Sequence, residues 1–533
     1  MAAEKREREA LIQRKATLYG RAVTAYVAAF PDLLHAPLTI VRCPARVNLR
    51  GMHIDSHGGG CNALAIPMET LLLFHPHRAG TPEEHTFVIK NANPAFPEVV
   101  IDSTRLQRDS GWSRYLVGVL EGLTEQHNQG RPLRGFSGLI TSDVPTGAGI
   151  SSSHSLVLAF MSGCLLANPE IIEMARTAEG KAGAVTGLAD QGHILHTCFY
   201  QNDHSAIRPA YAPFPPGHVV VVVDSLKARN LSGKEAANYA VPRFAYSVAL
   251  GLFTEVMRRA GYGEELVQRI DRLSRISPEE LGEPAGTAAI YRLLLQIPAR
   301  ITTHELVTQF PSLREVAEKA EQTYLCKLRP EMKPSHLELR GPLLFGIAEC
   351  ARAREFFRLL HVCASASTPS QRDQALLDMG RVMTIGHMGD SPKYADEHPI
   401  SDAYLQGLVD KLEADPADPS AQLYAQPGAF NASVPEMDEL QRILCAHGAL
   451  GASLTGAGMG GVVVGIVRAD RVAALKAAVE AEYHGPRRSS NDGAEGEDNS
   501  DPRRETFFVC VPISGVGALE LPSEDHSPEE RPA

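Results

Sequence analysis

The sequence contains no uninterrupted apolar run of about 18 residues, the length that a membrane-spanning helix requires. Its opening, MAAEKREREALIQRK, is highly charged and lacks the apolar core of a secretory signal. We therefore expect no membrane partner and no signal peptide.

Cysteine is scarce and shows no pairing pattern. The nine cysteines are odd in number, widely spaced and include no C-x-x-C pair, which argues against a disulfide framework or a zinc site. We expect free thiols in a reducing compartment, and hence a cytoplasmic protein. The positions are Cys43, Cys61, Cys164, Cys198, Cys326, Cys350, Cys363, Cys445 and Cys510.

Positive charge is not in excess, because 52 Lys and Arg residues face 63 Asp and Glu residues, for a formal net charge of −11. Proteins that bind nucleic acid neutralise phosphates with basic side chains, so we expect no nucleic-acid partner, although a local basic pocket is compatible with this charge. Hydrophobic residues make up 44% and charged residues 22%, an ordinary globular composition. A length of 533 residues predicts two to four domains.

Strand and helix patterns alternate along the chain, which predicts an α/β or α+β fold. Residues 4–30, 231–300 and 304–385 are mostly helical by pattern. HVVVVVDS at 218–225 is typical of a buried central strand. Further strands are expected at LTIVRCPARVNL, NALAIPMETLLLFHP, GFSGLITSD and FFVCVPI. The polar segments 485–504 and 522–533 cannot bury enough apolar surface to offset ordering entropy, so we expect a disordered insertion and a disordered tail.

The strongest local signal is PTGAGISSS at 145–153, between a predicted strand and a predicted helix. Glycines let successive backbone N–H groups point inward, and the helix N-terminus adds partial positive charge, so the segment predicts a phosphate cradle. The serines offer hydroxyl donors or a magnesium ligand. An ordinary N-capped turn is the alternative. The segment is not a Walker A loop, because no Lys follows the last glycine.

A second glycine-rich segment, GAGMGG at 456–461, formally matches the dinucleotide fingerprint G-x-G-x-x-G. That fingerprint needs a strand before it and a helix after it. Here the strand-like run VVVGIV follows, so the segment predicts a tight loop with positive φ at several glycines.

Two further segments carry polar groups. ARVNLRGMHIDSHGG at 45–59 predicts a polar pocket, with a sugar or polyol as ligand or with a metal held by His53, Asp55 and His57. GLADQ at 187–191 offers either a base in a desolvated site or a helix-capping Asp.

Taken in order, these four segments resemble the GHMP kinases, and within them the galactokinase branch. ARVNLRGMHIDSHGG resembles the galactokinase signature, VPTGAGISSSHS the ATP loop, GLADQ the family's G-I-M-D-Q and ASLTGAGMGG its last glycine-rich motif. WSRYLVGVL and SVPEMDELQ resemble two connecting segments. The resemblance spans roughly residues 38–520.

The resemblance implies ATP-dependent phosphorylation of a sugar at its anomeric hydroxyl, with ATP and Mg²⁺ as cofactors. Arg46 and Asp190 match the catalytic arginine and carboxylate of the family. The same resemblance implies that ATP is bound by Trp112, Tyr115, Pro145, Gly147, Ala148, Gly149, Ser151, Ser152 and Ser153, and that magnesium is bound by Ser153 and Glu179. It implies that the sugar is bound by Met52, His53, Asp55, Gly187, Arg50 and Tyr239. The C-terminal glycine-rich loop contributes Gly456, Gly458 and Gly460.

One departure from the galactokinase pattern bears on the sugar. Galactokinases carry a Glu before the signature His, and here that position is Met52. Losing a carboxylate there removes repulsion against an anionic sugar, and Arg50 offers a charge partner. We therefore predict a galacturonokinase-like enzyme, with a galactokinase or a fucose or arabinose 1-kinase as alternatives. An alternative of another class is a catalytically silent sugar or ATP-binding regulator.

The resemblance also implies a two-domain GHMP kinase fold, with a ribosomal-protein-like α/β domain followed by a ferredoxin-like α+β domain. We place the N-terminal domain at 1–230 and the C-terminal domain at 231–521, with the site between them. We expect a monomer, and an oligomer stays open.

Overall fold

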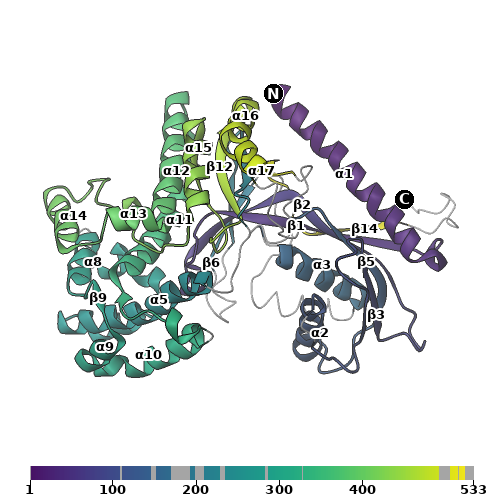
Figure 1. Cartoon of the computed structure of the whole chain (residues 1–533), viewed down its shortest axis with the longest axis horizontal. Helices are drawn as coiled ribbons and strands as arrows, with labels where there is room; N and C mark the ends of the chain where they lie inside the picture. The colour runs from purple at the N-terminus through teal and green to yellow at the C-terminus, as the bar shows by residue number, and fades with distance from the viewer. Residues whose placement is uncertain are drawn as a thin grey trace.

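In the computed structural model, the chain forms two lobes that meet near the ends of two long strands, β1 and β2 (Figure 1). The described residues are 2–108, 111–145, 150, 152–169, 193–198, 209–227, 234–282, 286–326, 328–490, 505–513 and 515–521.

One lobe is built on a sheet that has eight strands within the described residues. Its order is β14-β1-β2-β5-β3-β4, and β6 pairs with both β2 and β7. Neighbours are antiparallel except the parallel pair β3–β5. The strands are β1 (Leu38–Arg50), β2 (Gly60–Pro76), β3 (Thr86–Asn91), β4 (Val99–Asp102), β5 (Phe136–Ser142), β6 (His193–Cys198), β7 (Ala210–Pro213) and β14 (Gly517–Leu521).

Helices cover both faces of this sheet (Figure 1). Helices α2 (Ser113–His127) and α3 (Ser152–Ala167) pack on one face, where residues such as Leu120, Phe136 and Phe160 are fully buried. Helix α1 (Ala2–Ala29) lies on the other face through Ala22 and Tyr26. The sheet is therefore a central layer, as an apolar strand pattern on both faces requires.

The second sheet has the order β11-β12-β8-β13 and is antiparallel throughout. Its strands are β8 (His218–Asp224), β11 (Ala449–Leu454), β12 (Val462–Arg468) and β13 (Phe507–Cys510). Strand β8 lies between two partners, and its run of five valines is fully or almost fully buried, which confirms the central strand predicted at 218–225.

Helices dominate the other lobe. They are α5 (Lys234–Arg259), α6 (Glu264–Arg269), α7 (Pro278–Leu281), α8 (Gly286–Leu295), α9 (Thr303–Gln309), α10 (Arg314–Ala320), α11 (Arg340–Ser365), α12 (Pro369–Asp390), α13 (Pro392–Glu397), α14 (Asp402–Ala414), α15 (Pro435–Ala446), α16 (Val472–Val479) and α17 (Gly485–Ser490), with the short strands β9 (Arg300–Ile301) and β10 (Leu337–Glu338). One hydrophobic cluster joins most of these helices to the second sheet.

We predicted a domain boundary at residue 230, and sheet membership crosses that position in both directions. Strand β8 precedes that boundary but pairs with β12 and β13 of the C-terminal half. Strand β14, near the C-terminus, returns to the first sheet and pairs with β1. Pairing across such sequence distances leaves no local signal, so the boundary prediction followed motif order rather than sheet membership.

The predicted disordered insertion 485–504 also begins too early. Residues 485–490 form α17, which two arginines hold in place: Arg487 donates to Glu439 at 2.5 Å and Arg488 donates to Glu480 at 2.9 Å. The remainder, 491–504, and the predicted tail 522–533 lie outside the described residues.

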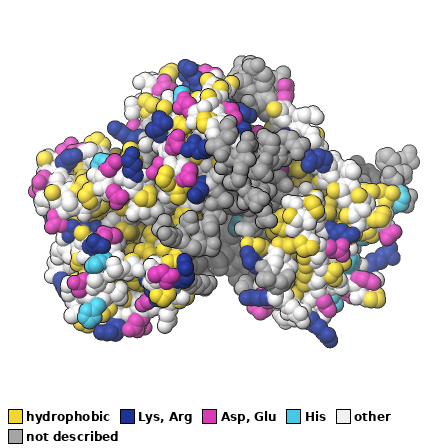
Figure 2. Space-filling model, viewed as in Figure 1, with side chains coloured by type: hydrophobic (Ala, Val, Ile, Leu, Met, Phe, Trp, Pro, Cys, Tyr) yellow, Lys and Arg dark blue, Asp and Glu magenta, His cyan; other side chains and the backbone are white. Residues whose placement is uncertain are grey.

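No helix within the described part of the chain is long and apolar enough to cross a membrane. All nine cysteines have free thiols, as predicted. On the face that Figure 2 shows, side chains of both charge signs are interspersed.

Candidate active site

Two motifs that lie about four hundred residues apart in sequence meet at the end of β1. The backbone N–H of Asn48 donates to Oγ1 of Thr455 at 3.0 Å, and the same hydroxyl donates to the carbonyl of Asn48 at 3.0 Å. Both side chains are buried. The signature strand and the loop 456–461 are therefore fixed against each other.

The C-terminal glycine-rich loop has the geometry that its sequence predicts. Gly456, Gly458 and Gly460 have φ values of 78°, 76° and 115°, which favour glycine. A Cβ on Gly458 would lie 2.1 Å from the carbonyl oxygen of Ala432. Strand β12 follows the loop, so the dinucleotide fingerprint lacks its helix.

A polar cluster supports this loop from the helical lobe. Asp438, in the segment SVPEMDELQ, accepts hydrogen bonds from the hydroxyls of Ser391 and Ser433. One of its oxygens lies 3.1 Å from Nε2 of His387. The other ring nitrogen of His387 accepts from the N–H of Leu454, one residue before Thr455. Helix α12 thus fixes the strand that enters the loop.

A buried carboxylate holds the signature loop, residues 51–59. Glu349 of α11 accepts hydrogen bonds from the backbone N–H groups of Gly51 and Met52, at 2.7 and 3.0 Å. Its other oxygen accepts a 2.6 Å hydrogen bond from Nε of Arg352. Both side chains are 0% exposed. The helical lobe therefore sets the backbone of the signature loop.

The structure corrects the prediction for Arg50. We expected its guanidinium to pair with an anionic substrate, but it is 0% exposed and pairs with Glu349, with Nη1 3.5 Å from Oε2. Nη1 also donates to the carbonyls of Val382 and Met383 in α12, at 3.4 Å each. Gly386 leaves the room for it, because a Cβ there would lie 1.3 Å from Nη1. Arg50 is thus buried against protein groups, although its Nη2 has no hydrogen-bond partner among the described residues.

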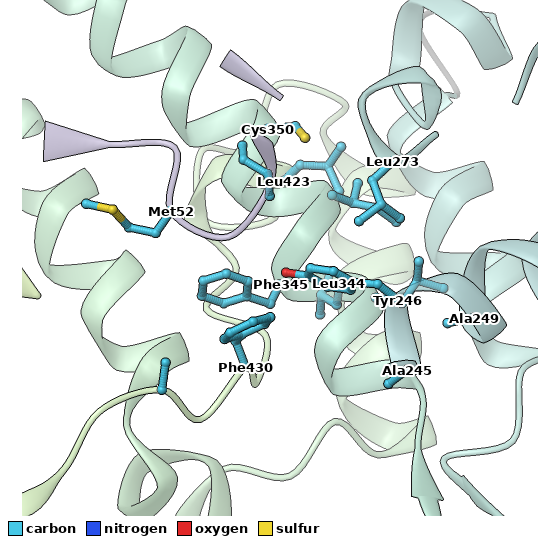
Figure 3. Packing of buried hydrophobic residues seen from close by; sticks show 14 of the residues in the cluster. Met52, Ala245, Tyr246, Ala249, Leu273, Leu344, Phe345, Cys350, Leu423 and Phe430 are labelled. Carbon is cyan, nitrogen blue, oxygen red and sulfur yellow. The ribbon is translucent and has the colours of Figure 1, made fainter. Parts of the chain in front are cut away.

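Met52 also differs from its prediction as a sugar contact. Its side chain is 2% exposed and belongs, with Ile54, to the hydrophobic cluster of the helical lobe. Figure 3 shows it on the signature loop, in the same hydrophobic cluster as Phe345 and Phe430. Burial among apolar neighbours gives Met52 the environment of a packing residue.

His53 is fixed on two sides. It has a φ of 62°, and its ring stacks on Phe430 at a centroid distance of 4.1 Å. Its Nε2 lies 3.4 Å from Oδ1 of Asp390, the last residue of α12. Asp390 is 0% exposed, and neither of its carboxylate oxygens has a hydrogen-bond partner among the described residues. A buried, unsatisfied carboxylate therefore faces the predicted sugar residue.

The predicted catalytic Arg46 is exposed, at a point where the β1–β2 register shifts. Desolvation, then Asp55, raise the pKa of Cys61 to about 12, and the charge of Arg46 opposes that rise. Partial desolvation, with a contribution from Arg46, lowers the pKa of His154 in the first turn of α3. Arg46 therefore lies within electrostatic range of both β2 and the helix that follows the predicted ATP loop.

The three residues considered as metal ligands do not converge. His53 faces Asp390, Asp55 is exposed, and the ring of His57 packs edge-on against Tyr246 at 5.3 Å. Burial, then the charge of Arg243, lower the pKa of His57 to about 4. Within the described part of the chain, no group of three or more His, Cys, Asp or Glu side chains is placed to hold a metal ion.

Among the residues predicted for ATP, those that the structure describes lie at α2, just after β5 and at the start of α3. Pro145 follows β5, and α3 begins with Ser152 and the exposed Ser153. Trp112 precedes α2 and lines a pocket of about 530 Å³, and Tyr115 lies in the first turn of the same helix.

Several predicted site residues lie outside the described residues. They are Gly147, Ala148, Gly149, Ser151, Glu179, Gly187 and Asp190. Tyr239 lies in α5, but its side chain is likewise outside the description.

Sequence reasoning missed Glu349, Arg352, Asp390 and Phe430. A signal existed for the first two, because LLFGIAECAR places one acid and one base three residues apart in an otherwise apolar stretch. Helical residues at that spacing are neighbours, so the pair indicates a buried ionic site.

Three sequence models of protein families match the chain. The galactokinase galactose-binding signature matches residues 25–76, the GHMP kinases N terminal domain matches 114–197, and the GHMP kinases C terminal model matches 411–485.

Characterised relatives agree with these matches. The galactokinase of Canis lupus familiaris is 30% identical over 305 residues, covering 52% of this chain and 74% of that protein. The galactokinase of Chloroflexus aurantiacus is 30% identical over 224 residues, covering 40% of this chain and 55% of that protein. The chain spans about half the length of the bacterial relatives that it matches.

The crystal structure of Lactococcus lactis galactokinase complexed with galactose superposes with a TM-score of 0.53 at 17% identity, covering 93% of this chain and 100% of that one. This likeness establishes the two-lobed fold.

Proposed function

The chain belongs to the galactokinase branch of the GHMP kinases, and we propose on that basis that it is an ATP-dependent sugar 1-kinase. The observation that carries the proposal is the pair of hydrogen bonds between Asn48 and Thr455. They hold the signature strand, with the exposed Arg46 two residues away, against the C-terminal glycine-rich loop.

The proposed mechanism follows the general logic of phosphoryl transfer, which is positioning and charge neutralisation. Arg46 stabilises negative charge on the transferring phosphoryl group. Asp190 accepts or orients the proton of the anomeric hydroxyl. The segment 145–153 holds the phosphates of ATP with backbone N–H groups and with the N-terminus of α3.

The proposed cofactors are ATP and Mg²⁺. Ser153, exposed in the first turn of α3, carries a hydroxyl oxygen of the kind that Mg²⁺ accepts. Glu179 is the second proposed ligand. When bound, the metal ion supplies charge neutralisation at the phosphates.

For the sugar, galactose is the first candidate, because the galactose-binding signature matches residues 25–76. The argument from Arg50 for an acidic sugar no longer stands, because its guanidinium is 0% exposed and pairs with Glu349. Galacturonate is the second candidate, favoured by Met52, which leaves no carboxylate at a position where galactokinases carry one.

The test measures sugar-dependent ADP release in a coupled assay with galactose, galacturonate, glucuronate, fucose and arabinose. Phosphorus NMR of the product places the phosphate on C1. Arg46→Ala should lower kcat by about 100-fold, as loss of one charge-stabilising donor does. Arg21→Ala is the matched control, because Arg21 is an exposed arginine of α1 that lies outside the matched signature 25–76.

Each outcome separates the candidates. Galactose as the best substrate supports the first candidate, and galacturonate as the best substrate replaces it with the second. Binding of sugar and ATP without ADP release would instead identify a catalytically silent regulator and overturn the proposal. ADP release that is unchanged in the Asp190→Ala variant would also overturn the proposal.

A further inference from the structure

The two flanks of the predicted ATP loop are tied together by a chain of three hydroxyls, of which those of Thr70 and Ser155 are buried and that of Ser142 is exposed. Oγ1 of Thr70 in β2 lies 3.0 Å from Oγ of Ser142, at the end of β5, and 2.8 Å from Oγ of Ser155, in the first turn of α3. Ser155 also donates to the carbonyl of Ser152 at 2.9 Å. One side chain from β2 thus contacts the residues before and after the loop.

The neighbouring Glu69 makes a second link to the same flank. Its backbone N–H donates to Oδ1 of Asp143 at 2.6 Å, and its carbonyl accepts from the N–H of Asp143 at 3.2 Å. Asp143 lies two residues before Pro145, where the loop begins. The backbone of β2 therefore fixes the exit of β5 on both sides of Asp143.

Helix α1 reaches both acids. Nζ of Lys15 lies 2.5 Å from Oε1 of Glu69, whose side chain is 0% exposed and whose other oxygen accepts from Nε of Arg42 at 2.9 Å. Arg14 donates to Oδ2 of Asp143 at 3.1 Å. Consecutive residues of α1 thus pair with the two acids that hold the loop flank.

We propose that helix α1 and β2 form a positioning device for the ATP loop, in which Lys15 and Thr70 set the affinity for nucleotide. This inference rests on the proposed function, because it takes 145–153 as the ATP loop. Lys15 and Thr70 act through Glu69 and through Ser142 and Ser155, so both are positioning residues.

The physical argument is that the side chain of Glu69 is fully buried between two basic residues, Lys15 and Arg42. A buried carboxylate keeps its place only while its partners remain, because an unpaired buried charge is costly. When the Lys15 ammonium is removed, Glu69 still accepts the hydrogen bond from Nε of Arg42. Glu69 then shifts toward Arg42 or toward water, and Asp143, bonded to its backbone, shifts with it.

The test compares Lys15→Met and Thr70→Val with two matched controls. Arg21→Met removes an exposed cation of the same helix, and Thr24→Val removes an exposed hydroxyl that bonds only to its own helix at Gly20. Calorimetry measures the Kd of MgATP, and steady-state kinetics measure KM for ATP and for sugar. Circular dichroism verifies that each variant is folded.

We expect Lys15→Met and Thr70→Val each to weaken MgATP binding about threefold to tenfold, the effect of one net hydrogen bond, with the sugar KM unchanged. Both controls should match the wild type. A merely structural role would change the two KM values together or lower only the melting temperature. Unchanged MgATP binding in folded Lys15→Met and Thr70→Val would overturn the inference.

A second measurement separates this inference from the proposed function. Hydrogen exchange of peptides covering 140–156 should speed up in both variants relative to both controls, whether or not a sugar is phosphorylated. Faster exchange in a protein that does not bind MgATP would refute the kinase proposal. It would leave only the coupling of Lys15 and Thr70 to the residues on either side of the loop 145–153. Unchanged exchange refutes the link itself.

Discussion

Replacing Glu349 by glutamine tests the buried ionic cluster that holds the signature loop. The carboxylate has four protein partners: the N–H groups of Gly51 and Met52 and the guanidinium groups of Arg50 and Arg352. Burial raises the pKa of Glu349, but Arg50 and Arg352 lower it more, so its pKa lies below the ordinary 4.5. The group is therefore ionised at neutral pH, and its pairing is lost only as the pH falls below that range.

The magnitude follows from what glutamine leaves behind. The amide oxygen still accepts from the loop N–H groups, but Arg50 and Arg352, both 0% exposed, lose their negative partner. Removing one member of a buried ion pair costs about 3–5 kcal/mol. We expect this loss in the free energy of unfolding, together with a raised KM for sugar.

The assay is a urea titration of a double-mutant cycle with Glu349→Gln, Arg50→Met and the combined variant. Far-UV circular dichroism follows both lobes, and the single tryptophan, Trp112, reports on the first sheet. The combined variant removes one charge of each sign. Its loss in the free energy of unfolding should therefore be about 1–3 kcal/mol smaller than the sum of the losses of the two single variants. Additivity within about 0.5 kcal/mol would refute the reasoning.

Three further predictions concern neighbouring groups. Burial lowers the pKa of His57 to about 4 from an ordinary 6.5, so the unfolded state binds more protons than the folded state between these pH values. The stability of the protein should therefore fall as the pH drops through this window. Thermal melts of His57→Gln should show a shallower fall in melting temperature over the same window. Gly458→Ala places a Cβ 2.1 Å from a carbonyl at positive φ and should lower the melting temperature, whereas Gly407→Ala, with open space around it, should not. Asp390→Asn should raise the sugar KM about threefold to tenfold through His53 without changing the KM for ATP, and equal effects on both would contradict it.

The parts of the fold that sequence predicted are those with local causes. The helix predicted at 4–30 follows from apolar residues at helical spacing, and the strand at 218–225 follows from a run of five valines. Positive φ at the glycines of 456–461 follows from glycine itself, whereas Met459 also has a positive φ of 60°. What failed depends on distant partners: β14 is a strand because β1 offers an edge, and α17 is ordered because Glu439 and Glu480 bind its arginines.

The same contrast governs the site. From sequence, Arg50 is an arginine in a pocket motif, and its chemistry indicates an anion without identifying which one. The structure supplies the anion as Glu349, about three hundred residues away, and adds a second buried carboxylate, Asp390, beside His53. The side-chain oxygens of Asp390 can accept hydrogen bonds from hydroxyl groups. Arg50 therefore no longer carries the argument for an acidic sugar that its place in the sequence motif indicated.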